Sequence, residues 1–294
     1  MSTAPHDAAL APQLPDTLRL GPVHLTISHL DRSLAYYERV LGLKVHDRDG
    51  EVATLGTGGE DLLALVEEAG AALGGRHAGL FHYALLYPSR KELAHALERI
   101  ARTQSRLAGA SDHGVSEAIY LRDPDDNGIE LYADRPRDEW PQPSHPDDRI
   151  GMYTIPLDVD DLLREIEGEE PREHAGPGIR MGHVHLHVGD VERALAFYGG
   201  VLGFEQMAAM KGAAFVSAGG YHHHLGFNSW LGPDVEPLPP NTAGLRHWTV
   251  LLSDRAEIDE VRARVQEAGL ATEPYETGFL VRDPWKTAVV FSLG

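Results

Sequence analysis

A long segment occurs twice in this chain of 294 residues, and this internal repeat constrains the fold more than any other feature. Residues 21–43 match residues 182–204 at a constant offset of 161, so that His24 falls on His185. The same offset aligns Tyr37 with Tyr198 and Gly42 with Gly203. Chance poorly explains so many matches at one offset, and they indicate an architecture built from copies of one unit.

A fainter repeat accompanies these two segments. Residues 80–86 (LFHYALL) resemble residues 245–251 (LRHWTVL), and each stretch precedes a helical pattern, at 89–102 and at 253–269. Each copy then ends with Arg-Asp-Pro and a last apolar strand. The chain is therefore divided into four units, near 20–70, 78–134, 180–232 and 244–294.

Local patterns predict the same order of elements within each unit. Residues 23–27 alternate between two kinds of side chain, which is typical of a strand. Asp31 and Ser89 are suited to cap the N-termini of the following helices, and Gly42 is suited to end the first helix. Further short apolar segments, separated by glycine pairs, predict three more strands. We therefore expect an α+β fold of four βαβββ modules.

We expect the four modules to form two domains. Residues 1–17 contain no basic or apolar stretch and are expected to form a disordered tail. Residues 18–134 would form the first domain from modules one and two, and residues 179–294 the second from modules three and four. The linker 135–178 is rich in proline and acidic residues and contains one helical candidate at 159–167.

Composition excludes several classes of function. The chain has no cysteine, so a metal would have to be bound by histidine, aspartate or glutamate. A formal net charge of −19 argues against nucleic acid as a partner. No stretch approaches the roughly 18 apolar residues of a membrane span, and the N-terminus does not resemble a signal peptide. We therefore expect a cytoplasmic protein that binds neither nucleic acid nor membrane.

The repeated module resembles that of the vicinal oxygen chelate superfamily, which includes glyoxalase I, fosfomycin-resistance proteins and extradiol dioxygenases. The resemblance covers nearly the whole chain after the tail, and the segment DPDDNGIE at 123–130 is fairly specific to the superfamily. Residues 111–120 (SDHGVSEAIY) and 220–228 (GYHHHLGFN) are similar to two-domain catechol 2,3-dioxygenases of the Bacillus type. The resemblance implies curved mixed sheets in which two modules together hold one divalent metal.

In this superfamily one module gives a histidine from its first strand, and the partner module gives a second histidine and a glutamate. The histidines at the first-strand position are His24, His82, His185 and His247. A glutamate occurs at the last-strand position only as Glu130 of module two, because module four has Val290 there. The resemblance therefore implies that His82 and Glu130 bind the metal, with His24 or His185 as the third ligand.

Two pairings of the modules are compatible with these candidates. Sequential pairing of modules one and two would give His24, and crossed pairing of modules two and three would give His185. Extradiol enzymes also need an acid–base histidine on the late strands of the module that provides the first ligand. Module three has His222–His224 there, whereas module one has the apolar segment 62–66. Because hydroquinone-cleaving relatives pair their modules crosswise, we predict crossed pairing with His185 as the third ligand.

The strand that contains His185 leaves its register open. His183 and His187 share a strand face with His185 because side chains alternate with a period of two. Either of them could be an outer neighbour of the metal, or could reveal that the repeat is misaligned on this strand.

The resemblance implies Fe(II) as the metal, with Mn(II) as the alternative. His223 would accept a proton from the substrate, although spacing does not settle which member of the run 222–224 faces the metal. His113 and Tyr120 would hydrogen-bond the substrate, since neutral groups suit a dry pocket better than charged ones.

We predict an extradiol ring-cleaving dioxygenase whose partners are a small aromatic diol and O2. Hydroquinone-type ring cleavage would use a similar metal set and is one alternative. A metal-dependent lyase of the glyoxalase or fosfomycin type would have a carboxylate or glutamine ligand where this chain has histidines. A bleomycin-binding protein would lack His82 and Glu130. The formation of a homo-oligomer stays open.

Overall fold

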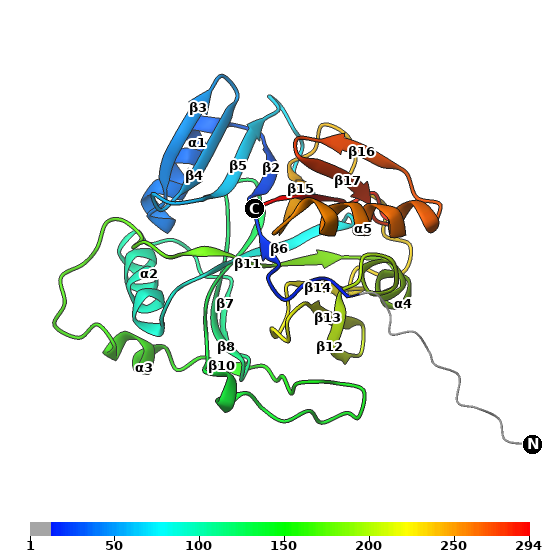
Figure 1. Cartoon of the computed structure of the whole chain (residues 1–294). Coiled ribbons are helices and arrows are strands. Elements are labelled where there is room, and N and C mark those ends of the chain that lie inside the picture. Colours follow the sequence, from blue (N-terminus) through cyan, green and yellow to red (C-terminus); the bar gives the residue numbers. More distant parts are fainter. Residues whose placement is uncertain (1–12) are drawn as a thin grey trace, which may run out of the picture.

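The computed structural model describes residues 13–294, which form two mixed sheets of nine strands each (Figure 1). The β2–β15 sheet has the order β16 (Thr272–Tyr275), β17 (Gly278–Arg282), β18 (Ala288–Leu293), β15 (Gly244–Leu252), β2 (Val23–Ile27), β5 (Asp61–Glu67), β4 (Val52–Gly56) and β3 (Lys44–Asp49), with β1 (Arg19–Leu20) paired to β15. The β6–β11 sheet has the order β10 (Ile155–Pro156), β7 (Gly109–Asp112), β8 (Ser116–Arg122), β9 (Gly128–Asp134), β6 (Gly79–Leu86), β11 (Arg180–His187), β14 (Leu225–Asn228), β13 (Ala213–Ser217) and β12 (Glu205–Met210).

The helices follow the first strands of the modules. The helical segments are α1 (Leu30–Tyr36) with η1 (Tyr37–Leu41), α2 (Arg90–Arg102), α4 (Val191–Leu195) with η3 (Ala196–Val201), and α5 (Arg255–Glu267). Each first strand therefore pairs in parallel with the last strand of its own module, because the helix crosses over between them. The predicted four βαβββ modules and the α+β fold are confirmed.

The modules pair crosswise in both sheets. Strand β6 of module two is antiparallel to β11 of module three, and β15 of module four is antiparallel to β2 of module one. The prediction of crossed pairing is therefore confirmed. The segment 18–134 consequently contributes strands to both sheets, so the division of the chain into two domains at residues 135–178 stays a prediction.

Sequential modules contact each other through their helices. The buried Arg99 of α2 donates through Nε to the carbonyl oxygen of Val40 at 3.3 Å and through Nη2 to that of Leu41 at 2.8 Å. Arg264 of α5 makes the equivalent two contacts at the end of the helix of module three. These arginines satisfy carbonyls that a helix leaves without an internal donor at its C-terminal end.

The Asp-Pro turns also bind the helix of the preceding module. The hydroxyl of Tyr37 donates to Asp123 at 2.8 Å, and the hydroxyl of Tyr198 donates to Asp283 at 2.9 Å. Crossed sheet pairing and sequential helix contacts together connect all four modules, and their apolar side chains form one main buried cluster.

One helix start differs from the sequence-based prediction. Ser89 caps α2 as expected, because its side chain accepts a hydrogen bond from the backbone N–H of Glu92. The N-cap of α1 is His29 rather than Asp31, because that helix begins at Leu30, two residues earlier than a cap at Asp31 would imply. Asp31 instead forms an exposed ion pair with Arg48 at 2.8 Å. Gly42 ends the helical segment with a φ of 72°, as predicted.

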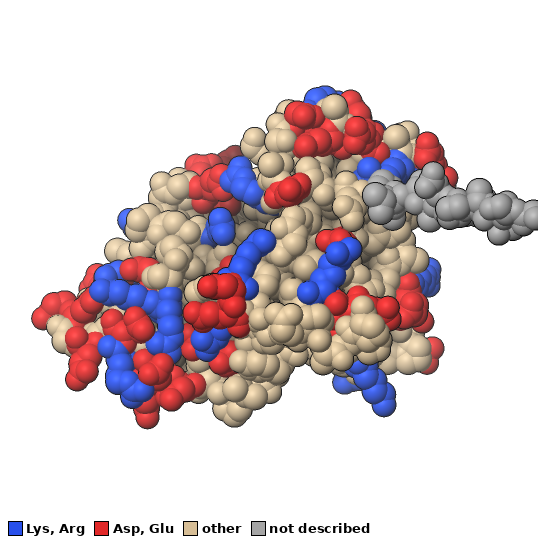
Figure 2. Space-filling model, turned by 60° about the horizontal axis from the view of Figure 1, so that its bottom comes forward, with Lys and Arg blue, Asp and Glu red and all other residues tan. Residues whose placement is uncertain are grey.

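The segment 135–178 contains η2 (Arg137–Glu139), β10 and α3 (Val159–Arg164). Strand β10 extends the β6–β11 sheet beyond β7, and α3 contacts α2 within the predicted helical candidate. Arg90 of α2 forms ion pairs with Glu117 of β8 and with Asp161 of α3, each at 2.6 Å. Figure 2 shows side chains of both signs interleaved on the left of this face, where α2 and α3 lie in Figure 1.

The predicted N-terminal tail falls mainly on residues 1–12, which lie outside the described residues. Leu14 is 5% exposed, and its backbone N–H donates to the carbonyl oxygen of Gly203 at 2.9 Å. Residues 13–17 are therefore packed against module three. Within residues 13–294, every helix is too short or too polar to span a bilayer.

We expect Arg99→Met to lower the free energy of unfolding by about 2–3 kcal/mol, because two buried carbonyls would lose their donors. Arg102→Met is the matched control on the same helix, where a half-exposed arginine pairs with Glu98. It should change stability by less than about 1 kcal/mol. Denaturant unfolding monitored by circular dichroism measures both values, and equal losses would contradict the role assigned to Arg99.

Candidate metal centre

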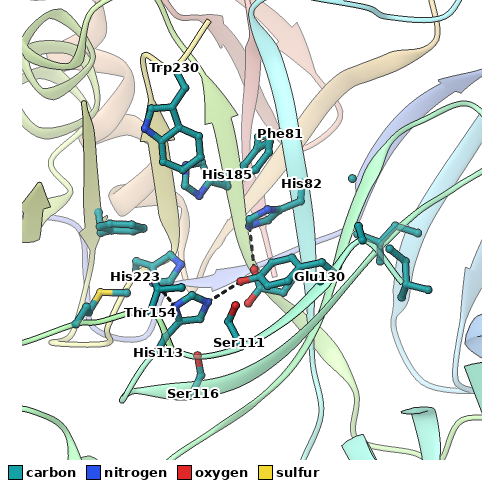
Figure 3. Close-up of a pocket in the computed structure, with 18 of the residues that line it drawn as sticks. Phe81, His82, Ser111, His113, Ser116, Glu130, Thr154, His185, His223 and Trp230 are labelled. Atoms are coloured by element: carbon teal, nitrogen blue, oxygen red, sulfur yellow. Dashed lines mark hydrogen bonds and ion pairs between the residues drawn. The ribbon is translucent and has the colours of Figure 1, made fainter. Parts of the chain in front are cut away.

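A cavity of about 460 Å³ opens over the β6–β11 sheet where modules two and three meet. Figure 3 shows Trp230 and Phe81 at one end of it, and His113 with Ser111 and Ser116 at the other. His82 and Glu130 lie between these two ends. Residues 152–154 of the segment 135–178 complete the wall.

Glu130 and His183 are brought together by one row of residues across the sheet. Ala84 of β6 pairs with Glu130 of parallel β9 on one side and with His183 of antiparallel β11 on the other. Because the residue between them is an alanine, the carboxylate and the imidazole can meet above its methyl group. His82 lies two residues before Ala84, so its side chain projects from the same face. Tyr120 of β8 extends the row beyond Glu130.

His82, Glu130 and His183 form a buried cluster whose ligand atoms all lie within 4.8 Å of one another. The Oε2 atom of Glu130 is 3.0 Å from Nε2 of His82 and 3.2 Å from Nε2 of His183. Despite this distance Nε2 of His82 has no hydrogen-bond partner, so it is directed at a point beside the carboxylate rather than at its oxygen. Two imidazoles and one carboxylate beside an open cavity are a donor set that fits Fe(II) or a similar divalent metal.

Burial and mutual attraction set the charges of this cluster. Burial alone would raise the pKa of Glu130, but His183 and His82 hold that pKa well below its usual range. Burial lowers the pKa of His183 to about 4, although Glu130 opposes this shift. At neutral pH the cluster therefore contains an ionised carboxylate and a neutral imidazole, and these are the forms that bind a cation.

His185 does not join the cluster, although the repeat pattern predicted it as the third ligand. Its Nε2 atom accepts a hydrogen bond from the side-chain amide of Asn228 at 2.9 Å, which occupies the lone pair that a metal would need. Its ring lies directly over Gly226, where an added Cβ would come within 2.9 Å of Nδ1. His183 therefore lies beside Glu130, whereas His185 lines the adjacent cavity wall, and the identity of the third ligand stays a prediction.

Spacing to the helix cap could have revealed His183. His82 lies seven residues before the N-cap Ser89, and His183 lies seven residues before the N-cap Asp190. His24 and His185 lie five residues before their caps, His29 and Asp190. The repeat had aligned these two with each other, and neither of them is equivalent to His82.

His24, the alternative third ligand, belongs to the β2–β15 sheet. It stacks on His247 with 4.0 Å between ring centroids. In that sheet Val290 and Thr249 pair at the positions that Glu130 and Ala84 occupy in the other. His24 and His247 therefore have no counterpart of Glu130 at the paired position beside them.

The three residues predicted to act on the substrate all line the cavity. Nε2 of His113 is 2.7 Å from the hydroxyl of Tyr120, and its Nδ1 is held at the edge of the cavity by Thr154 at 3.2 Å (Figure 3). His223 faces the cavity from module three, as Figure 3 shows. Of its neighbours in the histidine run, His222 is fully buried behind it, and His224 bonds Ser217 at 2.9 Å.

Comparison with known proteins agrees with this architecture. A catechol-2,3-dioxygenase of Bacillus subtilis (strain 168) is 43% identical over 279 residues, which are 92% of this chain and 95% of that protein. A putative dioxygenase from Bacillus subtilis subsp. subtilis str. 168 has a similar fold, with a TM-score of 0.63 at 11% identity over 96% of this chain and 86% of that one. Glyoxalase I from Zea mays gives a TM-score of 0.56 at 18% identity over 94% of this chain and 92% of that one.

A family model assigns both halves of the chain. It matches residues 19–131 and again residues 180–291, which together contain all four modules. The chain therefore belongs to the glyoxalase/bleomycin resistance protein/dioxygenase superfamily.

Proposed function

We propose that this protein is an Fe(II)-dependent extradiol dioxygenase that cleaves catechol-like diols with O2, with His82, Glu130 and His183 as metal ligands. The observation that carries the proposal is the buried His–Glu–His cluster beside a mainly apolar cavity. The 43% identity to a protein named catechol-2,3-dioxygenase supports it. When bound, the metal supplies a Lewis acid that chelates the two diol oxygens and leaves a position for O2.

His223 is the proton acceptor in this proposal. Burial, followed by the neighbouring imidazoles, holds the pKa of His223 well below its usual range, so that it is neutral at pH 7. A neutral imidazole facing the cavity can take a proton from a substrate hydroxyl.

Tyr120 and His113 orient the substrate from the opposite side. Burial, followed by the charge of Glu130, raises the pKa of Tyr120 well above its usual range. Its phenol therefore keeps its proton and donates it to Nε2 of His113, because Nδ1 of His113 faces the carbonyl oxygen of Tyr153 at 3.1 Å and carries the hydrogen of that ring. The oxygen of Tyr120 can accept a hydrogen bond from a substrate hydroxyl, and the phenol can stabilise negative charge on the substrate only after its hydrogen turns away from His113.

The cavity walls favour a diol with an uncharged, apolar substituent. Trp230 and Phe81 pack edge to face, with 5.5 Å between ring centroids, and Phe215 adds a third aromatic wall. Arg122 is the only lysine or arginine among the lining residues, and it already contacts Asp126 through the backbone oxygen at 2.7 Å. A carboxylate on the ring would lose its hydration without gaining a free cation.

Hydroquinone-type ring cleavage is the second candidate, because relatives with that activity resemble this chain in the crossed pairing of modules. A lyase of the glyoxalase or fosfomycin type is disfavoured by His223, which occupies the place where such enzymes present a carboxylate or glutamine ligand. Manganese instead of iron, a cytoplasmic location and a homo-oligomeric state stay predictions.

We expect His183→Ala to weaken Fe(II) binding by about 100-fold or more, since even outer partners of a metal ligand contribute 10–100-fold. Anaerobic titration of the metal-free protein with Fe(II) measures the affinity. Absorbance of the yellow ring-opened product, after addition of catechol and air, measures the activity.

His185→Ala and His24→Ala are the matched controls for this substitution. Both should retain stoichiometric iron binding, because neither imidazole lies in the His–Glu–His cluster. The ligand set would be refuted if His185→Ala, and not His183→Ala, released the iron. Stoichiometric iron without turnover of either catechol or hydroquinone would refute the activity itself.

We expect the wild-type protein to prefer an alkyl catechol over a catechol that carries a carboxylate. Trp230→Ala should lower kcat/KM for the alkyl substrate by about tenfold, because an aromatic wall is lost. The same substitution should lower kcat/KM for unsubstituted catechol by less. Steady-state oxygen consumption measures kcat/KM for the alkyl, carboxylated and unsubstituted catechols. Faster turnover of the carboxylated diol by the wild-type protein would contradict the inference that the cavity walls disfavour a charged substituent.

A further inference from the structure

A chain of hydrogen bonds leads from His223 away from the cavity to the protein surface. Nδ1 of His223 is 2.8 Å from Nδ1 of His222, and Nε2 of His222 is 2.8 Å from Oδ1 of Asp134. The hydroxyl of Tyr221 donates to the same carboxylate oxygen at 3.1 Å. The Asp134 side chain is 27% exposed, whereas both imidazoles are buried.

The chemistry of these three groups fixes where the hydrogens lie. An ionised aspartate only accepts hydrogen bonds, so the hydrogen in its contact with His222 belongs to Nε2. A neutral imidazole carries one N–H, and in His222 that hydrogen is the one on Nε2. Nδ1 of His222 is therefore an acceptor, and the hydrogen in the contact between the two rings belongs to Nδ1 of His223.

This assignment leaves Nε2 of His223 with a free lone pair. Within the described residues this atom makes no hydrogen bond to the protein, and the residue lines the cavity next to His183, with 4.1 Å between ring centroids. The opposite tautomer would point an N–H into the cavity, and such a ring could not accept a proton there.

The ring of His222 is held in place from two sides. Tyr221 packs on it with 4.1 Å between ring centroids, and Trp140 contacts it at 5.5 Å. Tyr221 is in turn fixed by the hydroxyl of Tyr132 at 2.7 Å. The ring therefore cannot rotate to exchange its two nitrogens without disturbing this packing.

We propose that Asp134 and His222 are positioning residues that hold His223 in the tautomer with a bare Nε2, and thereby make it a proton acceptor toward the substrate. The proposal rests on the role of His223 in the proposed function. Neither residue lines the cavity, and the hydrogen bond between His222 and His223 connects them to a residue that does.

Two substitutions of His222 separate its two hydrogen bonds. His222→Asn places an amide oxygen near the position of Nδ1, so that His223 keeps an acceptor for its N–H. His222→Gln places an amide N–H near the position of Nε2, so that Asp134 keeps its donor and His223 loses its acceptor. His224→Gln is the control in the adjacent position, because His224 bonds Ser217 outside this chain of contacts.

The tautomer can be read without turnover by ¹⁵N NMR of the full-length, metal-free protein labelled in histidine, with His223 assigned by the signals lost in His223→Gln. We expect the Nδ1–H tautomer of His223 in the wild type and in His222→Asn. We expect a shift to Nε2–H in His222→Gln. An Nε2–H tautomer in the wild type, or an unchanged tautomer in His222→Gln, would overturn the proposal.

Kinetics of the iron-loaded variants provide the second readout. We expect His222→Gln to lower kcat by about 100-fold, the usual contribution of a positioned acid–base group, with little change in KM or iron content. His222→Asn and His224→Gln should stay within about threefold of wild type. Equal losses in His222→Asn and His222→Gln would indicate a packing role and refute the proposal. If the wild type cleaves no diol, the proposed function fails while the NMR measurement still decides the tautomer.

Discussion

The antiparallel contact between β6 and β11 is the interaction on which the site depends. It joins a strand from module two to a strand from module three and places Ala84 directly between Glu130 and His183. A slip of one residue would turn one set of side chains to the other face of the sheet. This register therefore fixes the positions of the proposed metal ligands, of the cavity and of the histidines at 222–224.

The fold stabilises this register from outside the site. Arg99 and Arg264 bind the helix ends of the preceding modules, and the Tyr37–Asp123 and Tyr198–Asp283 contacts tie the Asp-Pro turns to the same helices. Sequential modules are thus joined by helices and crossed modules by strands. This arrangement allows the two sheets to carry different side chains at equivalent positions, because only one of them holds the polar cluster. The β2–β15 sheet has Val290 and Thr249 at the equivalent paired positions.

Burying a carboxylate among imidazoles is unfavourable unless the charge is compensated. Glu130 is compensated by His82 and His183 within the protein, and a divalent metal would compensate it further. The neutral state of His183 and His223 follows from the same burial, which lowers the pKa of both rings. Burial therefore keeps both rings in the neutral form that the proposed metal ligand and the proposed proton acceptor require.

The four modules follow from the repeats and the local periodicity of the sequence. The crossed pairing and the metal candidates His82 and Glu130 came from the resemblance to a known superfamily, together with which repeat positions carry groups able to bind a cation. The different surroundings of His183 and His185, which lie on the same face of one strand, exist only in the tertiary structure. They depend on the register across β6, which brings His183 beside Glu130, and on Asn228, which donates a hydrogen bond to His185. The contact between His222 and Asp134, which joins residues 88 positions apart in the chain, likewise exists only in the tertiary structure.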